Sequence, residues 1–185
     1  MYGVKISVKS LENAFIKFVF FVAIVGIISI IVGVLTNRDR IEPRRFPFGP
    51  FNWERGGRIY DRMRVSRWKT KVPDMSKILP YLYKKKISGR PAPEHIMMLI
   101  KETCIAEAVH SGMIIVSPLI YVYIGGWWGV AFAAVYAVGN LPYVIIQRYN
   151  RPLLIGLYDR LVARQQKKSM EGEHIEHTDT LMQYR

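Results

Sequence analysis

Two long stretches without a charged residue constrain this chain more than any other feature. Phe18 to Asn37 (20 residues) and Ser111 to Gln147 (37 residues) contain no Asp, Glu, Lys or Arg. At about 1.5 Å of rise per residue, a helix of 20 residues spans the roughly 30 Å hydrocarbon core of a bilayer. A soluble globular domain is therefore excluded, and the sequence predicts an all-α integral membrane protein.

The first stretch is interpreted as an N-terminal transmembrane helix over about residues 14–37. A cleaved signal peptide is the alternative, but its apolar region is normally about 7–15 residues long and precedes a small-residue cleavage site. Here the apolar run is longer and ends in Asn37-Arg38-Asp39-Arg40. These features favour a helix that stays in the chain and crosses the membrane.

The second stretch is interrupted by Gly125-Gly126, and Trp127-Trp128 follow at once. Adjacent glycines favour a tight turn, and Trp is enriched at the membrane–water interface. We therefore expect a helical hairpin that turns at the glycines. Its two legs are expected over residues 105–125 and 127–147.

The first leg of this hairpin is short. From Ser111 to Ile124 it has 14 residues, or roughly 21 Å of helix. To cross the bilayer it must begin near Ile105, which carries Glu107 and His110 into the membrane border. A re-entrant hairpin that does not cross is the alternative. In both cases the two polar residues lie unusually deep.

The distribution of basic residues sets the expected orientation. The formal net charge is +13, and 17 of the 27 Lys and Arg residues lie in residues 38–101, with seven after Gln147 and three before the first stretch. The positive-inside rule therefore places residues 38–101 and the C-terminus in the cytoplasm and, if the first helix crosses fully, the N-terminus outside. If the first helix does not cross, the N-terminus is cytoplasmic too. We expect a multi-pass protein of the plasma membrane with a cytoplasmic active face. A basic nucleic-acid-binding domain would not contain the charge-free stretches, so no nucleic-acid partner is expected.

The chain is expected to form a single membrane domain. Residues 38–104 are rich in Arg, Pro and aromatic residues, which is typical of a basic interfacial segment. Basic side chains near a bilayer surface gain about 1 kcal/mol each from anionic lipid. Residues 148–185 are expected to form an amphipathic helix followed by a polar tail.

Glu107 and His110 form the most informative polar pair. They are three residues apart in the stretch Glu94–His110, whose apolar residues recur with helical periodicity, so their side chains are neighbours on one helix face. A carboxylate beside an imidazole can orient it as a general base. The alternative is a structural ion pair at the membrane border. Ionisable groups at such a depth are costly, which favours a functional role.

The hairpin brings further polar residues to the same depth. If two antiparallel helices turn at residues 125–126, residues at equal depth have numbers that sum to about 251. His110 then lies level with Leu141, beside Asn140, and Glu102 lies level with Tyr149. The residues expected to gather in one cytoplasm-facing pocket are Glu102, Glu107, His110, Asn140, Arg148, Asn150 and Arg151.

Arg148 and Arg151 present planar guanidinium groups suited to phosphate or carboxylate. Membrane anchoring by basic residues is the alternative for either one. The single Cys104 excludes an intramolecular disulfide and a Cys-based zinc finger, and we predict no metal site. His174 and Asp179 have the H-x4-D spacing of glycerolipid acyltransferases, but they lie in the polar tail, and we interpret the spacing as coincidence.

Four sequence blocks occur in order between roughly residues 46 and 155. The blocks are Phe51-Asn52-Trp53-Glu54; Trp68-Lys69-x-Lys71-x-x-Asp74; Glu102-Thr103-x-x-Ala106-Glu107-x-x-His110; and Asn140-x-Pro142 leading to Gln147-Arg148-Tyr149-Asn150-Arg151-Pro152. The last two blocks are the more specific. Together the four blocks resemble the glycosyl-4,4'-diaponeurosporenoate acyltransferase family of carotenoid-glycolipid biosynthesis.

The resemblance implies an acyltransferase that moves a fatty acyl chain to a sugar hydroxyl of a membrane-embedded glycolipid. On this hypothesis His110 is the general base, Glu107 orients it, and Asn140 or Asn150 donates to the oxyanion. The expected catalytic residues are His110, Glu107, Glu102 and Asn140. The expected substrate-binding residues are Arg148, Asn150, Arg151, Gln147, Lys69, Lys71 and Trp68, of which the arginines and lysines would hold phosphates of the acyl donor.

This reaction requires no cofactor beyond an acyl-CoA or acyl-carrier thioester as co-substrate. The expected partners are the lipid bilayer, the acyl donor and a lipid-linked sugar acceptor, and self-association into a homo-oligomer stays open. A non-catalytic membrane adaptor of a lipid-biosynthesis complex is the main alternative, and a lipid hydrolase that uses the same base with water is a third.

Overall fold

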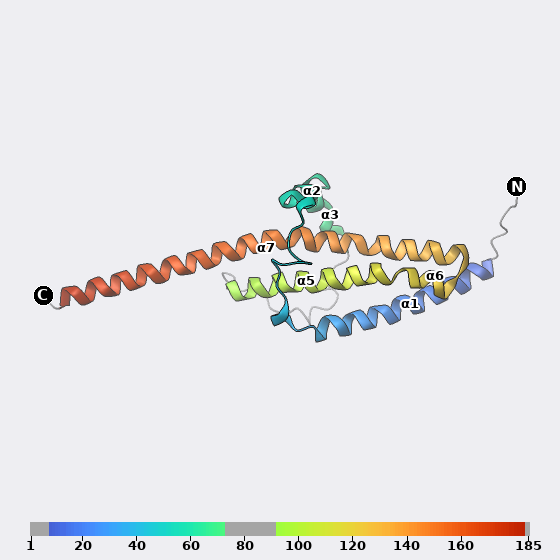
Figure 1. Cartoon of the computed structure of the whole chain (residues 1–185), viewed down its shortest axis with the longest axis horizontal. Helices are drawn as coiled ribbons and strands as arrows, with labels where there is room; N and C mark the ends of the chain where they lie inside the picture. The colour runs from blue at the N-terminus through green and yellow to red at the C-terminus, as the bar shows by residue number, and fades with distance from the viewer. Residues whose placement is uncertain (1–7, 73–91, 184–185) are drawn as a thin grey trace.

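The computed structural model describes residues 8–72 and 92–183, and within these ranges it contains helices and turns but no strand (Figure 1). The part of the expected interfacial segment at residues 73–91 lies outside the described residues. The elements, in chain order, are α1 (Val8–Leu35), η1 (Arg38–Arg40), η2 (Asn52–Gly57), α2 (Arg58–Arg62), α3 (Val65–Trp68), η3 (Lys69–Lys71), α5 (Pro93–Val116), α6 (Pro118–Ile124) and α7 (Gly126–Gln183).

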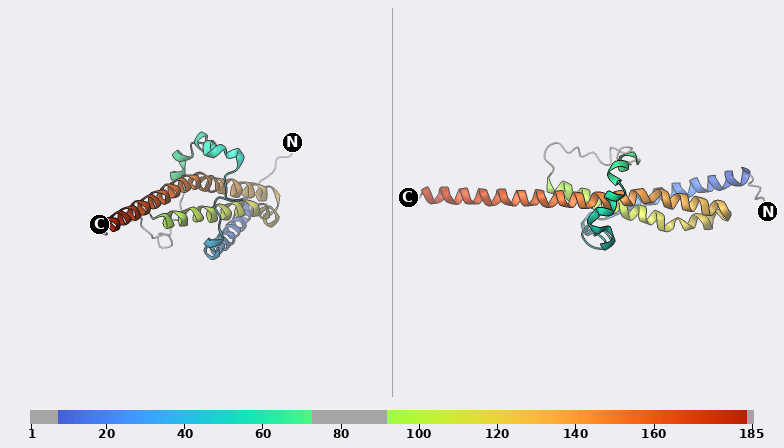
Figure 2. Two further views of the ribbon diagram at one scale, coloured as in Figure 1. Left: turned by 60° about the vertical axis from the view of Figure 1, so that its left-hand side comes forward. Right: turned by 90° about the horizontal axis from the view of Figure 1, so that it is seen from above.

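The long helices α1, α5 and α7 lie side by side, and α5 packs against α7 along most of its length (Figure 1). The chain reverses direction between α6 and α7, so α7 runs antiparallel to α5 and α6. The C-terminal part of α7 extends well beyond the other helices in every view (Figure 2). The described core is therefore concentrated between α5 and the first half of α7.

Glycine permits the reversal and the close packing that follows it. Gly125 and Gly126 have φ values of 75° and 57°, in the left-handed region that favours glycine. A Cβ atom at Gly129 would lie 3.1 Å from the Tyr121 Cα atom and 3.2 Å from its carbonyl oxygen. The backbones of α6 and α7 can therefore approach closely only because residue 129 has no side chain.

Three helical stretches are long and apolar enough to cross a membrane: Val8–Leu35, Pro93–Ile124 and Gly126–Glu171. In α1, the only buried side chain is that of Ala14. Large apolar side chains cover the rest of the helix, including Phe20, Ile27 and Val34, which are exposed by 62%, 60% and 58%. This helix has an apolar exterior on nearly every side.

One face of α1 is held to the bundle by aromatic side chains. The Phe18 ring stacks on Phe132 with centroids 4.7 Å apart, and both Phe18 and Phe21 meet the edge or face of Tyr136. At the other end of α1, the chain that follows it is tied to α5 by an ion pair between Arg38 Nε and Glu102 Oε1 at 3.0 Å.

Helix α5 contains the whole stretch Glu94–His110 and begins at Pro93, before the membrane leg expected from residue 105. Proline is well suited to the first helical position, and Ile96 and Ile100 are buried against the bundle. Helix α7 continues through residues 148–183 as one helix, although it contains Pro142 and Pro152 and a polar end was expected to form a separate tail. The polar composition of the C-terminal residues therefore does not coincide with the end of α7.

Within the segment between α1 and α5, the described residues 36–72 fold into turns and short helices that lie across α7 (Figure 1). Tyr60 and Val65 anchor it, since their side chains are 3% and 0% exposed. Glu54 closes its first turn by accepting a hydrogen bond from the Phe51 backbone N–H at 2.9 Å. This packing places the Glu54 carboxylate against Arg148 of α7.

Candidate functional site

His110 lies on α5 and faces Asn140 of α7. Its Nδ1 atom is 2.8 Å from Asn140 Oδ1, and Asn140 Nδ2 donates to the Tyr136 carbonyl oxygen at 2.8 Å. The Tyr143 ring stacks on the imidazole with centroids 4.4 Å apart and planes 9° from parallel. The imidazole is thus fixed in its plane by one hydrogen bond and one stacked ring.

This arrangement determines which imidazole nitrogen can act as a base. The Asn140 NH₂ group donates to a backbone carbonyl, so the amide oxygen faces His110 and can only accept. Nδ1 must therefore carry the hydrogen, which leaves the lone pair on Nε2 in the neutral ring. A neutral imidazole of this tautomer is a proton acceptor at Nε2.

Glu107 has a different set of partners from those expected from the sequence. Its carboxylate is 6% exposed and accepts hydrogen bonds from Arg148 Nε at 2.7 Å and from Arg151 Nη2. Both carboxylate oxygens are therefore engaged by arginines of α7. In this geometry Asn140, and not Glu107, orients His110.

Arg148 is held by contacts from three parts of the chain. Besides Glu107, its Nη1 donates to Glu54 Oε1 at 2.6 Å and its Nη2 to the Pro47 carbonyl oxygen at 2.7 Å. The guanidinium carbon lies 4.1 Å from the centroid of the Phe51 ring. One arginine thus joins α5, α7 and the segment between α1 and α5.

Arg151 is engaged in the same way one turn further along α7. Its Nε donates to Thr103 Oγ1 at 3.0 Å, its Nη1 to the Phe48 carbonyl oxygen at 2.6 Å, and its Nη2 to the Thr103 carbonyl oxygen at 3.1 Å as well as to Glu107. The residue is only 2% exposed. We call Glu54, Glu107, Arg148 and Arg151 the buried charge network.

The buried charge network changes the interpretation of the two arginines. Every guanidinium nitrogen of Arg148 and Arg151 already has a protein partner. A phosphate could bind them only by displacing a buried carboxylate or backbone carbonyl, which would leave a desolvated polar group unpaired. The geometry therefore favours a structural use of these charges over the expected contact with donor phosphates.

Tyr60 completes the network on its outer side. Its hydroxyl donates to Glu54 Oε1, and burial, reinforced by this hydrogen bond, raises the pKa of the phenol well above its ordinary value. The phenol therefore stays protonated at neutral and moderately alkaline pH. It remains a hydrogen-bond donor to Glu54 throughout that range.

The remaining residues expected at the site form separate contacts. Glu102 pairs with Arg38, as described above, and Lys69 Nζ donates to Asn150 Oδ1 at 2.9 Å. Lys69 also lies 4.7 Å from the centroid of the Tyr149 ring.

Trp68 Nε1 donates to the Met63 carbonyl oxygen at 3.1 Å, Gln147 is partly exposed, and Lys71 is exposed. The seven residues expected to share one pocket are therefore distributed over four contacts along α5 and α7. These contacts are His110 with Asn140, Glu107 with Arg148 and Arg151, Glu102 with Arg38, and Asn150 with Lys69.

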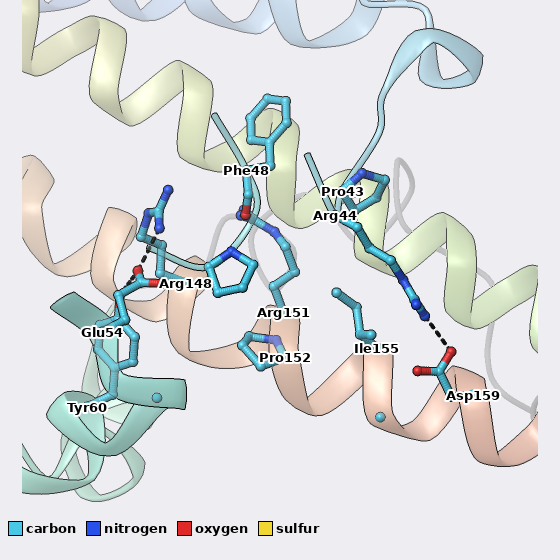
Figure 3. Close-up of a pocket in the computed structure, with 13 residues that line it drawn as sticks. Pro43, Arg44, Phe48, Glu54, Tyr60, Arg148, Arg151, Pro152, Ile155 and Asp159 are labelled. Carbon is cyan, nitrogen blue, oxygen red and sulfur yellow. Dashed lines mark hydrogen bonds and ion pairs between the residues drawn. The ribbon is translucent and has the colours of Figure 1, made fainter. Parts of the chain in front are cut away.

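A cavity of about 500 Å³ is lined in part by Glu54, Arg148 and Arg151 of the buried charge network, and His110 is not among its lining residues (Figure 3). Its apolar wall includes Phe48, Pro152 and Ile155, and Arg44 forms an ion pair with Asp159 at its edge. Arg148, which lines this cavity, is eight residues from Asn140 on α7, or roughly 12 Å along a helix axis. The cavity and the imidazole are therefore separate features.

Three residues that belong to the buried charge network or bind it were not among the expected site residues: Glu54, Tyr60 and Thr103. Glu54 and Thr103 stand inside two of the sequence blocks quoted above, so a signal was present for them. Tyr60 had no such signal, because its contact with Glu54 depends on the path of the chain through the short helices.

In the part of the chain described, no group of three or more His, Cys, Asp or Glu side chains is placed to hold a metal ion. The side chains of His174 and Asp179, which have the H-x4-D spacing, lie outside the described part of the chain.

Comparisons with known proteins agree with the sequence blocks. A family model described as glycosyl-4,4'-diaponeurosporenoate acyltransferase matches residues 43–160, which contain the buried charge network, His110 and Asn140. The proteins of that name from Staphylococcus aureus strains N315 and USA300 are 31% identical to this chain over 112 residues, which is 60% of this chain and 67% of each relative. No solved structure matches the chain. The chain is therefore an acyltransferase and belongs to the glycosyl-4,4'-diaponeurosporenoate acyltransferase family.

Proposed function

We propose that this protein transfers a fatty acyl group from a thioester donor to a hydroxyl of a glycosylated carotenoid or a similar glycolipid. The observation that carries the mechanism is the contact between His110 Nδ1 and Asn140 Oδ1 at 2.8 Å. It fixes the tautomer whose Nε2 can accept a proton. The names of the Staphylococcus aureus relatives support the class of acceptor.

In the proposed step, His110 Nε2 removes the proton of the acceptor hydroxyl while the hydroxyl oxygen attacks the thioester carbonyl carbon. The tetrahedral intermediate then collapses, the carbon–sulfur bond breaks, and the imidazolium returns the proton to the leaving thiolate. The products are an ester and a free thiol, and no cofactor enters the balance. Asn140 stabilises the imidazolium because its amide oxygen accepts from Nδ1–H in both protonation states.

We further propose that Arg148 and Arg151 act as a scaffold for this site. Their contacts join α5 and α7 to the segment at residues 47–54, and this holds His110 and Asn140 at a fixed separation. Of the other basic residues expected to bind substrate, Lys71 is exposed and Lys69 is bound to Asn150. Lys71 therefore stays the more accessible candidate for an anionic group.

We propose that the chain is a multi-pass protein of the plasma membrane, with the N-terminus outside and residues 38–72 on the cytoplasmic side. The exposed apolar surface of α1 supports insertion, because such a surface has no compensation in water. In this orientation α5 and α6 together form one leg of the membrane hairpin and α7 forms the other. His110 would then lie at the cytoplasmic border of the bilayer.

The deciding experiment is an acyl-transfer assay in membranes that contain the protein, with labelled acyl thioesters and a panel of glycolipid acceptors. The wild type is compared with His110→Ala and with His95→Ala, a matched histidine near the start of α5. General-base catalysis typically contributes about 10² to 10⁴ in rate, so His110→Ala should lose about that factor. His95→Ala should retain the wild-type rate.

Two outcomes would contradict the proposal. Full turnover by His110→Ala would remove the imidazole from the mechanism. Absence of product from the wild type with every donor, together with co-purification of a lipid-biosynthesis enzyme, would favour the adaptor alternative. A free fatty acid as the only product would instead indicate hydrolysis.

A further inference from the structure

A second hollow, of about 250 Å³, is formed by the turn η2 and helix α2. It is lined by Trp53, Arg55, Arg58, Ile59 and Arg62. The three arginines recur at intervals of three and four residues, so their side chains gather on one side of this short helical segment. We call Trp53, Arg55, Arg58 and Arg62 the Trp–Arg pocket.

No described carboxylate neutralises the charges of the Trp–Arg pocket. Among the side chains described in residues 8–72 and 92–171, none forms an ion pair with Arg55, Arg58 or Arg62, and all three arginines are exposed. Like charges at these spacings repel one another. An anion bound between them would relieve that repulsion, and guanidinium groups are well suited to phosphate.

The Trp53 indole adds a second recognition element. It is 56% exposed, although tryptophan side chains in folded proteins are usually well buried. An exposed aromatic face can stack on a planar base, which is worth roughly 1–3 kcal/mol per base in nucleic-acid complexes. Three arginines beside an open indole therefore fit a ligand that combines several phosphates with a planar ring.

The Trp–Arg pocket is built on the buried charge network. Glu54 stands between Trp53 and Arg55, and its carboxylate is held by Tyr60, Arg148 and the Phe51 backbone N–H. Arg55 has a φ of 50°, which is uncommon for a residue other than glycine. Such a conformation persists where surrounding contacts enforce it, and it is frequent at binding sites.

The Phe51 ring links this pocket to the catalytic region. It stacks on Trp53 with centroids 6.1 Å apart and lies under the Arg148 guanidinium. Arg148 binds Glu107, which is one helical turn from His110. A line of contacts therefore connects the Trp–Arg pocket to the helical turn that carries His110.

We propose that the Trp–Arg pocket binds the phosphorylated nucleotide of a coenzyme A thioester, with Trp53 stacked on the adenine and Arg55, Arg58 and Arg62 holding the phosphates. This inference rests on the proposed acyl transfer, for which it specifies the donor. An acyl-carrier protein presents a single phosphodiester and no base, and a lipid headgroup presents phosphate without a planar ring. The nucleotide end of coenzyme A has both features.

The test measures binding of adenosine 3',5'-bisphosphate to the purified full-length protein in nanodiscs of zwitterionic lipid. Wild type should bind the nucleotide, and binding should weaken with added salt. The double variant Arg58→Ala/Arg62→Ala should lose at least ten-fold in affinity, and Trp53→Leu should lose several-fold. Arg67→Ala, which removes an exposed arginine of the neighbouring helix α3, should bind as wild type does.

Three results would overturn the inference. They are failure of the wild type to bind the nucleotide, an equal loss in Arg67→Ala, and a double variant that loses only its association with phosphatidylglycerol vesicles. The last result would assign the pocket to membrane lipid instead.

The donor assignment can fail independently of acyl transfer. His110→Ala should bind the nucleotide with wild-type affinity although it does not transfer the acyl group. In the double variant, the ratio of kcat/KM for acyl-CoA to kcat/KM for an acyl-pantetheine should fall at least ten-fold. If the wild type transfers acyl groups but shows equal kcat/KM for both donors, the donor assignment fails and the transferase function stands.

Discussion

At the scale of single residues, Glu107 lies between two arginines of α7 and one turn from the proposed general base. Its carboxylate is buried and accepts from both guanidinium groups. Removing one partner of a buried ion pair is costly, because the remaining charge is left without solvent or counter-charge. The side chain therefore links the stability of the helix packing to the geometry of His110.

Substitution of Glu107 should expose this cost. In Glu107→Ala, Arg148 and Arg151 each lose a buried carboxylate, and we expect a loss of about 3–5 kcal/mol in the free energy of unfolding. Glu102→Ala is the matched control, since its pair with Arg38 is partly exposed and should contribute about 1 kcal/mol or less. Thermal unfolding of both variants in detergent provides the measurement. Equal melting temperatures would contradict a structural role for the buried network.

Asn140 tests the assignment of the His110 tautomer. Asn140→Leu removes the acceptor for Nδ1–H, and transfer should fall by roughly 10²-fold, the lower end of the contribution of a general base. Asn140→Asp presents an oxygen in the same place and should restore most of kcat, with KM for the acceptor unchanged in both variants. Steady-state kinetics separate the two constants. An Asp variant as slow as the Leu variant would indicate that the amide NH₂, and not its oxygen, matters.

At the scale of elements, the contact between α6 and α7 depends on a backbone approach at Gly129. The carbonyl oxygen and Cα atom of Tyr121 lie where a side chain would otherwise be placed. Pro118 begins α6 after α5 has ended at Val116, and Tyr121 of α6 lies against α7 at Gly129. Small residues allow such close helix packing within membranes.

A larger residue at position 129 should therefore separate these helices. Gly129→Val should destabilise the protein by about 1–3 kcal/mol, the usual cost of inserting volume into a packed contact. Gly139→Val is the matched control on the same helix, because a Cβ atom there meets nothing within 4 Å. Melting temperatures of the two variants provide the comparison. Similar values for both would show that α6 and α7 are not held by this approach.

At the scale of the whole molecule, the family match contains the contact between α5 and α7 but not the end of α7. The family model covers residues 43–160, whereas α7 extends past the other helices to Gln183 (Figures 1 and 2). A helix without neighbours on any side contributes little to the global stability of a protein. The end of α7 is therefore expected to be dispensable for folding and for transfer.

Truncation tests this division. A chain that ends at Arg164 should retain the wild-type melting temperature within about 2 °C, since a change of 1 kcal/mol in a protein of this size shifts it by about 2–4 °C. It should also retain the wild-type rate of acyl transfer. The assay of the previous section provides the measurement. Loss of transfer without loss of stability would give the removed residues, including His174 and Asp179, a catalytic role.

Several features could be predicted from the sequence because they depend on local composition. The lengths of the charge-free stretches predict the long apolar helices, and the two glycines predict the reversal between α6 and α7. With the turn at residues 125–126, residues at equal depth in the hairpin have numbers that sum to about 251, and this places His110 beside Asn140. Helical periodicity from Glu94 agrees with the start of α5 at Pro93. Composition, however, did not predict that α7 continues to Gln183, because helix ends depend on packing as well as on polarity.

By itself, then, the sequence determined the helical class of the protein, the turn of its hairpin and the family to which it belongs. Only the tertiary structure decided how the charges are paired. The sequence spacing is equally compatible with Arg148 and Arg151 as phosphate ligands and with Glu107 as the residue that orients His110. The path of residues 47–60 places Glu54 and backbone carbonyls against α7, and desolvated guanidinium groups bind the partners that this path provides. Such partners are distant in sequence, so no local pattern could have identified them.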